Sequence, residues 1–371
     1  MRTRLFLLFL GMALIFKFPL KTNACTGITL KSESGTTIVA RTIEWGGGNL
    51  NSQYVVVPRG YQAISYTPDG INGMTFKARY GYVGFAVEQK EFIAEGLNEV
   101  GLSAGLFYFP KYGEYEKYEA SKRDISISDL QLVSWLLGEC ASVDDIKEAI
   151  SKVRIISLDP QISTVHWRFA DISGRQLVLE IIGGEPRFYE NTLGVLTNSP
   201  GFDWQLTNLN NYVNLFPGAA PGQSLGVLRL SPFGSGSGFL GIPGDVTPPS
   251  RFVRAAFYQT SAPRQKTALD VVFQAFQILN SFDIPIGIEV ATGEVAADIP
   301  SATQWTSVTD MQNRIVYFRT MYNSAIRSID LNTIDFSSVQ YHAKPLDRSK
   351  QQPIESIMVK SGNVGIFGEY V

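Results

Sequence analysis

The chain is short of both cysteine and histidine, with two of each among 371 residues. Two cysteines, Cys25 and Cys140, are too few for a disulfide framework. Cys140 lies in an apolar helical pattern, which predicts a buried thiol. A cysteine–histidine catalytic pair would have to use His166 or His342. His166 lies in a strand-like run, where a packed or hydrogen-bonded core histidine is the expectation, and His342 lies in a polar stretch where a solvated ring is expected.

The chain also lacks an excess of charge of either sign. Its 32 lysines and arginines face 34 aspartates and glutamates, for a formal net charge of -2, and no block of like charge is present. Nucleic-acid binding is therefore disfavoured. Internal repeats are absent as well, and no cofactor is expected.

Long apolar runs are absent after the first residues. Residues 5–16 are apolar, follow Arg2 and Arg4, and precede Thr22, Asn23 and Ala24. This is the pattern of a secretory signal peptide, and the apolar run is short for a membrane span. The sequence thus predicts a signal peptide at residues 1–24 and one mature domain at residues 25–371. We expect a soluble, exported protein, periplasmic or secreted, without a membrane anchor after cleavage.

Alternating strand patterns dominate the first part of the mature chain. Ile28 and Leu30, a turn at Ser34-Gly35 and the residues up to Arg41 predict a hairpin, and further strands are expected at 54–57, 81–87 and 102–109. Helical spacing follows at 126–137, and a capping box predicts a second helix from Ser142 to about Val153.

The second half shows the same mixture. A hairpin is predicted at 165–182 and a short strand at 194–197, while the Gly-, Ser- and Pro-rich residues 217–249 fit either a long ordered loop or a flexible linker. Helices are expected at 250–258 and 267–282, and strands at 315–320 and 324–329. This order predicts an α+β fold of antiparallel sheets layered with helices.

Cleavage before Cys25 would leave this cysteine with a free α-amine next to its thiol. An α-amino group titrates near ~7.7–8.0, so it can accept the thiol proton and later return one to a leaving amine. No histidine is then required. The main alternative is lipidation of Cys25, as in bacterial lipoproteins, but the third residue before the cut is Thr22 rather than a Leu-like residue. A lipid-anchored surface binding protein is the corresponding alternative function.

Short segments spread over nearly the whole mature chain form a recognisable series. They are residues 25–29 (CTGIT), 40–45 (ARTIEW), 96–102 (GLNEVGL), 166–167 with 171–174 (HW and DISG), 196–200 (LTNSP), 203–206 with 208–212 (DWQL and NLNNY) and 250–254 (SRFVR). Each segment alone is a weak signal, but in this order they resemble the choloylglycine hydrolases, the N-terminal-nucleophile amidases that include bile salt hydrolases and penicillin V acylases.

The resemblance implies roles for six residues. Cys25 would attack the amide carbonyl, and positive charge from Arg41 and Arg251 would favour its thiolate. Glu44 stands where the family usually has Asp and would hold the α-amine by hydrogen bonding. Asn198 would stabilise the oxyanion with its side-chain amide, together with a backbone N–H near Tyr108, where bile salt hydrolases tend to carry Asn and penicillin V acylases Tyr.

The resemblance also implies a four-layer αββα sandwich and a homotetramer. The expected reaction is hydrolysis of a linear N-acyl amide through a thioester on Cys25. Conjugated bile salts, which would release glycine or taurine, are the first expectation for the substrate. Penicillin V or another acyl amide, such as an acyl-homoserine lactone, is the alternative that Tyr108 favours.

Overall fold

Two antiparallel sheets pack face to face at the centre of the molecule. The computed structural model describes residues 23–46, 48–159, 164–293 and 302–359, so the predicted signal segment lies outside it except for its last two residues. The five-stranded sheet has the order β1 (Asn23–Lys31), β2 (Thr37–Trp45), β16 (Ala302–Asp310), β17 (Ile315–Thr320) and β18 (Asn323–Asp330).

The second sheet has eight strands and also pairs antiparallel throughout. Its order is β13 (Glu185–Glu190), β12 (Gln176–Ile182), β11 (Val165–Ala170), β8 (Ser103–Tyr108), β7 (Ile93–Asn98), β6 (Tyr82–Ala86), β3 (Gln53–Val57) and β19 (His342–Pro345).

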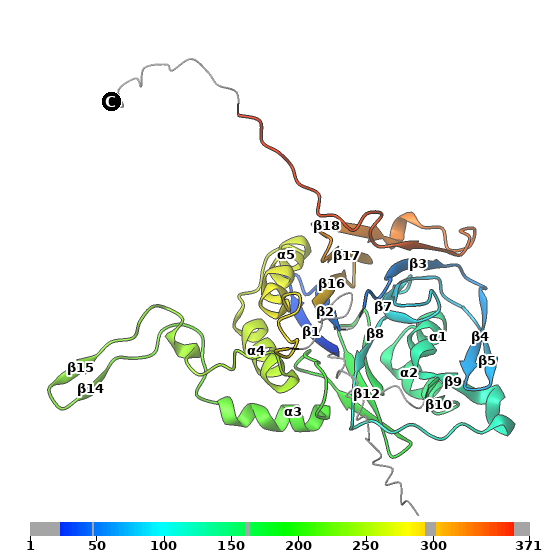
Figure 1. Cartoon of the computed structure of the whole chain (residues 1–371), viewed down its shortest axis with the longest axis horizontal. Helices are drawn as coiled ribbons and strands as arrows, with labels where there is room; N and C mark the ends of the chain where they lie inside the picture. Colours follow the sequence, from blue (N-terminus) through cyan, green and yellow to red (C-terminus); the bar gives the residue numbers. More distant parts are fainter. Residues whose placement is uncertain (1–22, 47, 160–163, 294–301, 360–371) are drawn as a thin grey trace, which may run out of the picture.

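Helices cover the outer face of each sheet, which gives four layers (Figure 1). The helices α4 (Pro248–Ser261) and α5 (Ala268–Leu279) lie against the five-stranded sheet. The helices α1 (Leu132–Glu139) and α2 (Val143–Ile150) lie on the side of the eight-stranded sheet. This αββα arrangement confirms the predicted fold class. None of the helices in the described ranges has both the length and the apolar character needed to cross a bilayer.

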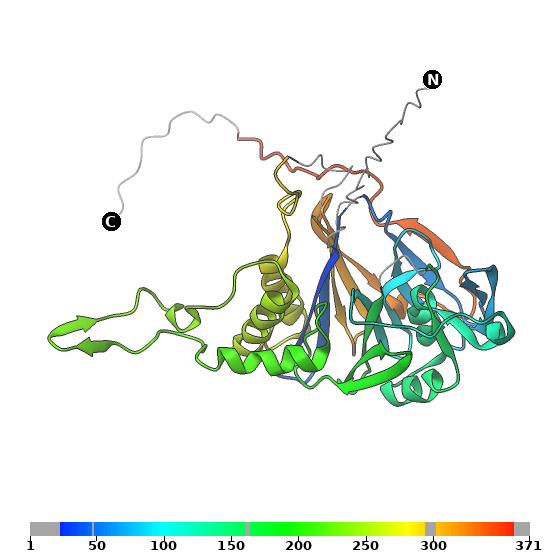
Figure 2. The ribbon, with the colours of Figure 1, turned by 60° about the horizontal axis from the view of Figure 1, so that its bottom comes forward.

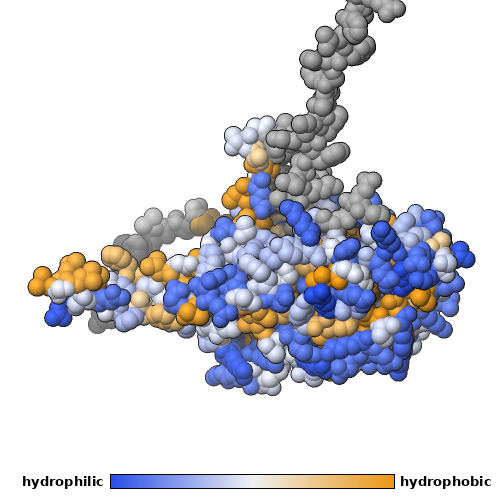
Figure 3. Space-filling view, turned by 90° about the horizontal axis from the view of Figure 1, so that it is seen from below, coloured by the Kyte–Doolittle hydropathy of each residue, from blue (hydrophilic) through white to orange (hydrophobic). Residues whose placement is uncertain are grey.

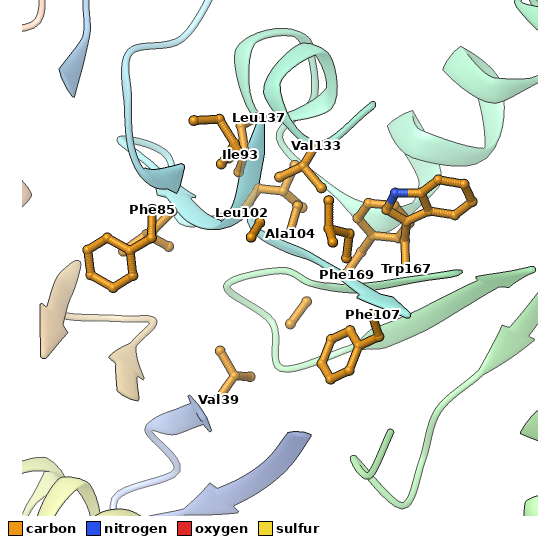
Figure 4. Close-up of a cluster of buried hydrophobic side chains, with 14 of the residues drawn as sticks. Val39, Phe85, Ile93, Leu102, Ala104, Phe107, Val133, Leu137, Trp167 and Phe169 are labelled. Carbon is orange, nitrogen blue, oxygen red and sulfur yellow. The ribbon is translucent and has the colours of Figure 1, made fainter. Parts of the chain in front are cut away.

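The eight-stranded sheet buries apolar side chains on both of its faces. Figure 4 shows Val133 and Leu137 of α1 beside Ile93 of β7, and Trp167 on the same side, while Phe107 points toward Val39 of the other sheet. Side chains alternate along a strand, so Trp167 points to the helical layer and its neighbours His166 and Arg168 point between the sheets. Polar groups are thus carried into the interface between the two sheets.

Smaller elements extend from this core. They are the hairpin β4 (Gln62–Thr67) and β5 (Gly70–Lys77), the parallel pair β9 (Ser126–Ser128) and β10 (Arg154–Ile156), the helix α3 (Phe202–Asn208), and the hairpin β14 (Gln223–Leu225) and β15 (Leu228–Leu230). Figure 2 shows β14 and β15 at the end of an arm that projects away from the four layers.

Two local predictions were wrong. The helix expected from residue 126 begins at Leu132, because Ser126–Ser128 pairs with β10 as a short strand. The strand expected at residues 194–197 is a single bridge between Leu196 and Gly27. Residues 217–249, which fitted either a long ordered loop or a flexible linker, contain a hairpin and, at the end of the range, the start of α4.

Candidate active site

Cys25 lies on β1, the strand expected to begin the mature chain. It stands opposite Ile43 in the β1–β2 ladder, and its side chain is buried. In this chain Asn23 and Ala24 precede it within the same strand, so the nitrogen of Cys25 is part of a peptide bond. Side chains alternate along β1, so Cys25 and Gly27 lie on the same face of the strand. A Cβ atom at Gly27 would meet Arg168 and Phe107 of the other sheet. The thiol is therefore held between the two sheets.

The side chain of Asn198 forms hydrogen bonds with Cys25 and with two groups near it. Its Oδ1 accepts a hydrogen bond from the backbone nitrogen of Cys25 at 2.9 Å and another from Arg251 Nη2 at 2.7 Å. Its Nδ2 donates to the carbonyl of Tyr108 at 2.7 Å. A side-chain amide has two N–H groups, so one remains for a further acceptor. Asn198 thus joins β1, β8 and α4 at one point.

Arg251 reaches the site from the first turn of α4. Its Nη1 donates to the carbonyl of Cys25 at 2.5 Å and to Thr26 Oγ1 at 2.8 Å, and its Nε donates to the carbonyl of Val246. The side chain is fully buried, and desolvation lowers the pKa of its guanidinium. Most of its donors are committed to fixed oxygens, so Arg251 has a single orientation.

Arg41 occupies the other side of the thiol. Its Nη1 donates to the carbonyls of Ala94 and Leu106, at 3.1 and 2.6 Å, and lies 3.6 Å from Glu95. Its guanidinium stacks 4.1 Å from the centre of the Phe107 ring. Arg41 extends from β2 to β7 and β8, so it ties the two sheets together beside Cys25.

Glu44 is fully buried on β2, opposite Ala24. Its Oε1 accepts a hydrogen bond from Thr303 Oγ1 at 3.1 Å, and burial raises the pKa of its carboxyl to about 7. The hydrogen bond expected between Glu44 and the nitrogen of Cys25 is not the one formed in this chain, in which that nitrogen donates to Asn198. A peptide N–H has a single hydrogen, and Asn198 Oδ1 receives it.

The thiol of Cys25 is governed by burial more than by its charged neighbours. Burial raises its pKa above the ordinary value, and Glu44 adds to the rise, while Arg41, a backbone hydrogen bond from Tyr108 and Arg251 lower it. The two arginines act in the expected direction, but desolvation outweighs them. The resting thiol is consequently protonated, and a base is needed to generate the nucleophile.

The six predicted residues therefore meet at one place, although they come from β1, β2, β8, α4 and the segment after β13. Sequence reasoning missed two partners, Thr303 and Glu95. Thr303 lies on β16, a strand that was not expected and that pairs with β2. Glu95 lies on β7, within 3.6 Å of both Arg41 and Arg168. No motif marks either residue, because both act through pairings distant in sequence. In the described part of the chain, no group of three His, Cys, Asp or Glu side chains is arranged to hold a metal ion.

A sandwich of this kind, with a cysteine near the start of its first strand, defines an N-terminal-nucleophile hydrolase. The chain belongs to the linear amide C–N hydrolases of the choloylglycine hydrolase family, whose model matches residues 25–343 and so begins at Cys25.

Sequence relatives agree with this assignment. The chain is 32% identical over 319 residues to a bile salt hydrolase/transferase of Clostridium perfringens, covering 83% of this chain and 92% of that protein. It is 32% identical over 335 residues to a bile salt hydrolase/transferase of Lactiplantibacillus plantarum, covering 88% and 98%. A penicillin V acylase of Pectobacterium atrosepticum is 24% identical over 343 residues, covering 85% of this chain and 82% of that protein.

Solved structures show the same fold. A mutant of the conjugated bile acid hydrolase from Clostridium perfringens superposes with a TM-score of 0.78 at 28% identity, covering 90% of this chain and 99% of that one. The penicillin V acylase from Agrobacterium tumefaciens shares the fold with a TM-score of 0.70 at 21% identity, covering 88% and 93%.

Proposed function

We propose that the mature protein hydrolyses the amide bond of conjugated bile salts and releases glycine or taurine. The observation that carries the proposal is the bonding of Asn198, which joins the nitrogen of Cys25, the backbone of Tyr108 and Arg251. Relatives at 32% identity that are named bile salt hydrolases support the choice of substrate.

The reaction begins at the Cys25 thiol. The free α-amine of the cut chain removes the thiol proton, and the sulfur adds to the amide carbonyl of the substrate. The oxygen that becomes negative is stabilised by the remaining N–H of Asn198 and a backbone N–H at Tyr108. The amine then returns its proton to the leaving nitrogen, and water cleaves the thioester.

Glu44 holds the new α-amine in this proposal. Cleavage removes Asn23 and Ala24, which stand opposite Trp45 and Glu44 in the ladder, and leaves a neutral α-amine near a buried carboxyl. When this amine takes the thiol proton it becomes a cation, which lowers the pKa of the nearby carboxyl and favours the ionised form of Glu44. The extra methylene of Glu relative to Asp is accommodated by Thr303, which anchors Oε1.

Penicillin V is the second candidate substrate. Tyr108 favours this substrate in the family resemblance noted in the sequence, and a penicillin V acylase is a sequence relative. The deciding experiment compares release of product from glycocholate, taurocholate and penicillin V by the mature protein. A higher kcat/KM for the two bile salts supports the proposal, and a higher kcat/KM for penicillin V replaces it with acylase activity.

We further propose that the protein is exported through its first 24 residues and works as a homotetramer. The two arginines and the short apolar run before Cys25 support export, and intact mass of the purified protein is the test. A mass equal to that of an unmodified chain beginning at Cys25 supports export and excludes the lipid-anchored binding protein. A mass increased by acyl groups would support the lipid-anchored binding protein instead.

The projecting arm supports association of copies. It carries apolar side chains that are largely exposed in the single chain: Leu225, Val227, Leu228, Phe233 and Leu240. Figure 3 shows this arm as an apolar extension of a mostly hydrophilic face. A two-stranded hairpin is at best marginally stable alone in water, so an arm of this composition is stabilised when another subunit covers it.

A further inference from the structure

His166 lies close to the proposed site without touching Cys25. It is fully buried on β11, on the face between the sheets. Its Nδ1 lies 3.1 Å from Glu180 Oε1, and its Nε2 lies 3.1 Å from the backbone carbonyl of Thr197. Phe109 stacks on the ring at 4.3 Å, nearly parallel to it. The ring is thus fixed in place on both edges and on one face.

Both partners of the ring are hydrogen-bond acceptors. Nε2 faces a carbonyl oxygen, so this nitrogen carries the N–H that donates to Thr197. Glu180 Oε1, on the other edge of the ring, also accepts the backbone N–H of Phe202 at 2.9 Å. The ring is therefore held between two oxygens that are themselves fixed by the fold.

Thr197 connects His166 to the site, because the next residue is Asn198. The carbonyl of Thr197 belongs to the peptide unit that leads into Asn198, and His166 Nε2 lies within hydrogen-bond distance of that carbonyl. We propose that His166, held between Glu180 and the carbonyl of Thr197, is a positioning residue that fixes the peptide before Asn198 and so aims its side-chain amide. This inference rests on the proposed role of Asn198 in stabilising the oxyanion.

The protonation of His166 can be measured directly, because the chain has only two histidines. The probe is the mature protein labelled with ¹⁵N-histidine, with a His342→Asn variant to assign the signals. We expect Nε2 of His166 to carry the proton that it donates to the carbonyl of Thr197. A His166 Nε2 without a proton would overturn the proposal, whatever the activity of the protein.

Kinetics test the positioning role. His166→Phe should lower kcat on taurocholate by about tenfold to a hundredfold, with KM nearly unchanged. This loss of kcat should not exceed the loss caused by removing an oxyanion donor. Glu180→Gln keeps an oxygen beside Nδ1 of the ring, so its loss of kcat should be smaller. A purely structural role would not lower kcat while leaving KM nearly unchanged.

Trp167→Phe is the matched control, since Trp167 is equally buried on the same strand but points to the helical layer. It should lower the melting temperature and leave kcat and KM unchanged. A His166→Phe kcat within twofold of the wild-type value would contradict the inference. Full activity of Asn198→Ala would instead refute the proposed role of Asn198, and the labelling result would still report on His166.

Discussion

Single residues decide how this site works, and burial is the main influence on them. The thiol of Cys25 and the carboxyl of Glu44 both have raised pKa values, because each is removed from water. Below pH 7 both are mainly neutral in the uncut chain. In the proposed mature chain a neutral α-amine can take the thiol proton, and the cation so formed is a counter-charge for the carboxyl. Cleavage before Cys25 would therefore change the protonation of the whole site.

Glu44 gives a prediction for stability in a chain that begins Met-Asn23-Ala24 and so retains the peptide bond to Cys25. An unfolded Glu ionises near pH 4.5, whereas the folded carboxyl ionises at about pH 7. Between these values only the folded protein keeps the proton, so stability falls as the pH rises through this window. Above pH 7 the full cost, about 3 kcal/mol, is present.

Glu44→Gln removes this dependence in the same chain. We expect urea unfolding of the variant to give a free energy of unfolding that exceeds that of the parent at pH 8 and converges with it at pH 4.5. Glu33→Gln, at an exposed position, is the control and should follow the parent at both values. Equal losses of stability with pH in all three chains would show that Glu44 is not the buried group responsible.

Asn198 gives a prediction for catalysis. Asn198→Ala should lower kcat about 10²–10³-fold with a smaller effect on KM, because its amide acts on the developing oxyanion. Asn210→Ala, which alters an exposed asparagine of the adjoining segment, should leave both constants unchanged. Steady-state assays on taurocholate measure both constants. A kcat for Asn198→Ala near that of the wild type would show that Asn198 takes no part in the reaction.

At the scale of elements, the hairpin of β1 and β2 carries three of the six predicted residues. Its alternating pattern and its Ser34-Gly35 turn were sufficient to predict it from the sequence, as was the capping box at Ser142, which the structure confirms. The helix at α4 was also predicted, and with it the position of Arg251. These elements are specified by local signals: strand alternation, turn residues and helix caps.

Other elements could not be predicted in the same way. The strand β16 (Ala302–Asp310) is buried along nearly its whole length although most of its residues are polar, so it shows neither an apolar run nor a clear alternation. The strand β7, which carries Glu95, is fully buried too. Cys25, Arg41, Glu44, Asn198 and Arg251 were grouped through a family resemblance, whereas Thr303 and Glu95 follow only from strand pairing.

Gly27 offers a test of how closely the two sheets approach at β1. A Cβ atom at this position would lie 2.7 Å from Arg168 Nη1 and 3.0 Å from the ring of Phe107. Gly27→Ala should therefore destabilise the protein by about 1–3 kcal/mol and lower activity, since both neighbours are held by other contacts. Gly48→Ala, where a Cβ meets open space, should be neutral. Thermal unfolding measures both, and equal melting temperatures would contradict the close packing.

At the scale of the whole molecule, the arm around β14 and β15 is the feature that a single chain leaves unexplained. Val227 and Phe233 are almost completely exposed there. If copies of the chain cover the arm, Val227→Asp combined with Phe233→Asp should convert the tetramer to a smaller species. Light scattering coupled to size-exclusion chromatography gives the mass directly.

The control for this experiment is Ile64→Asp combined with Ile71→Asp, which places the same charges on the exposed hairpin of β4 and β5. It should leave the oligomer intact. A wild-type protein that elutes as a monomer would exclude the tetramer, and a tetramer that survives the arm substitutions would assign the interface to another surface.

The central claim is that hydrolysis requires a free α-amine on Cys25. It is tested most directly by measuring taurine release from taurocholate by two chains that differ by three residues: the mature chain beginning at Cys25, and the chain beginning Met-Asn23-Ala24. The mature chain should turn over and lose its activity on Cys25→Ser, while the longer chain, confirmed by intact mass, should be inactive. Equal turnover by the longer chain would contradict the account, because its only nitrogen at Cys25 is a peptide N–H.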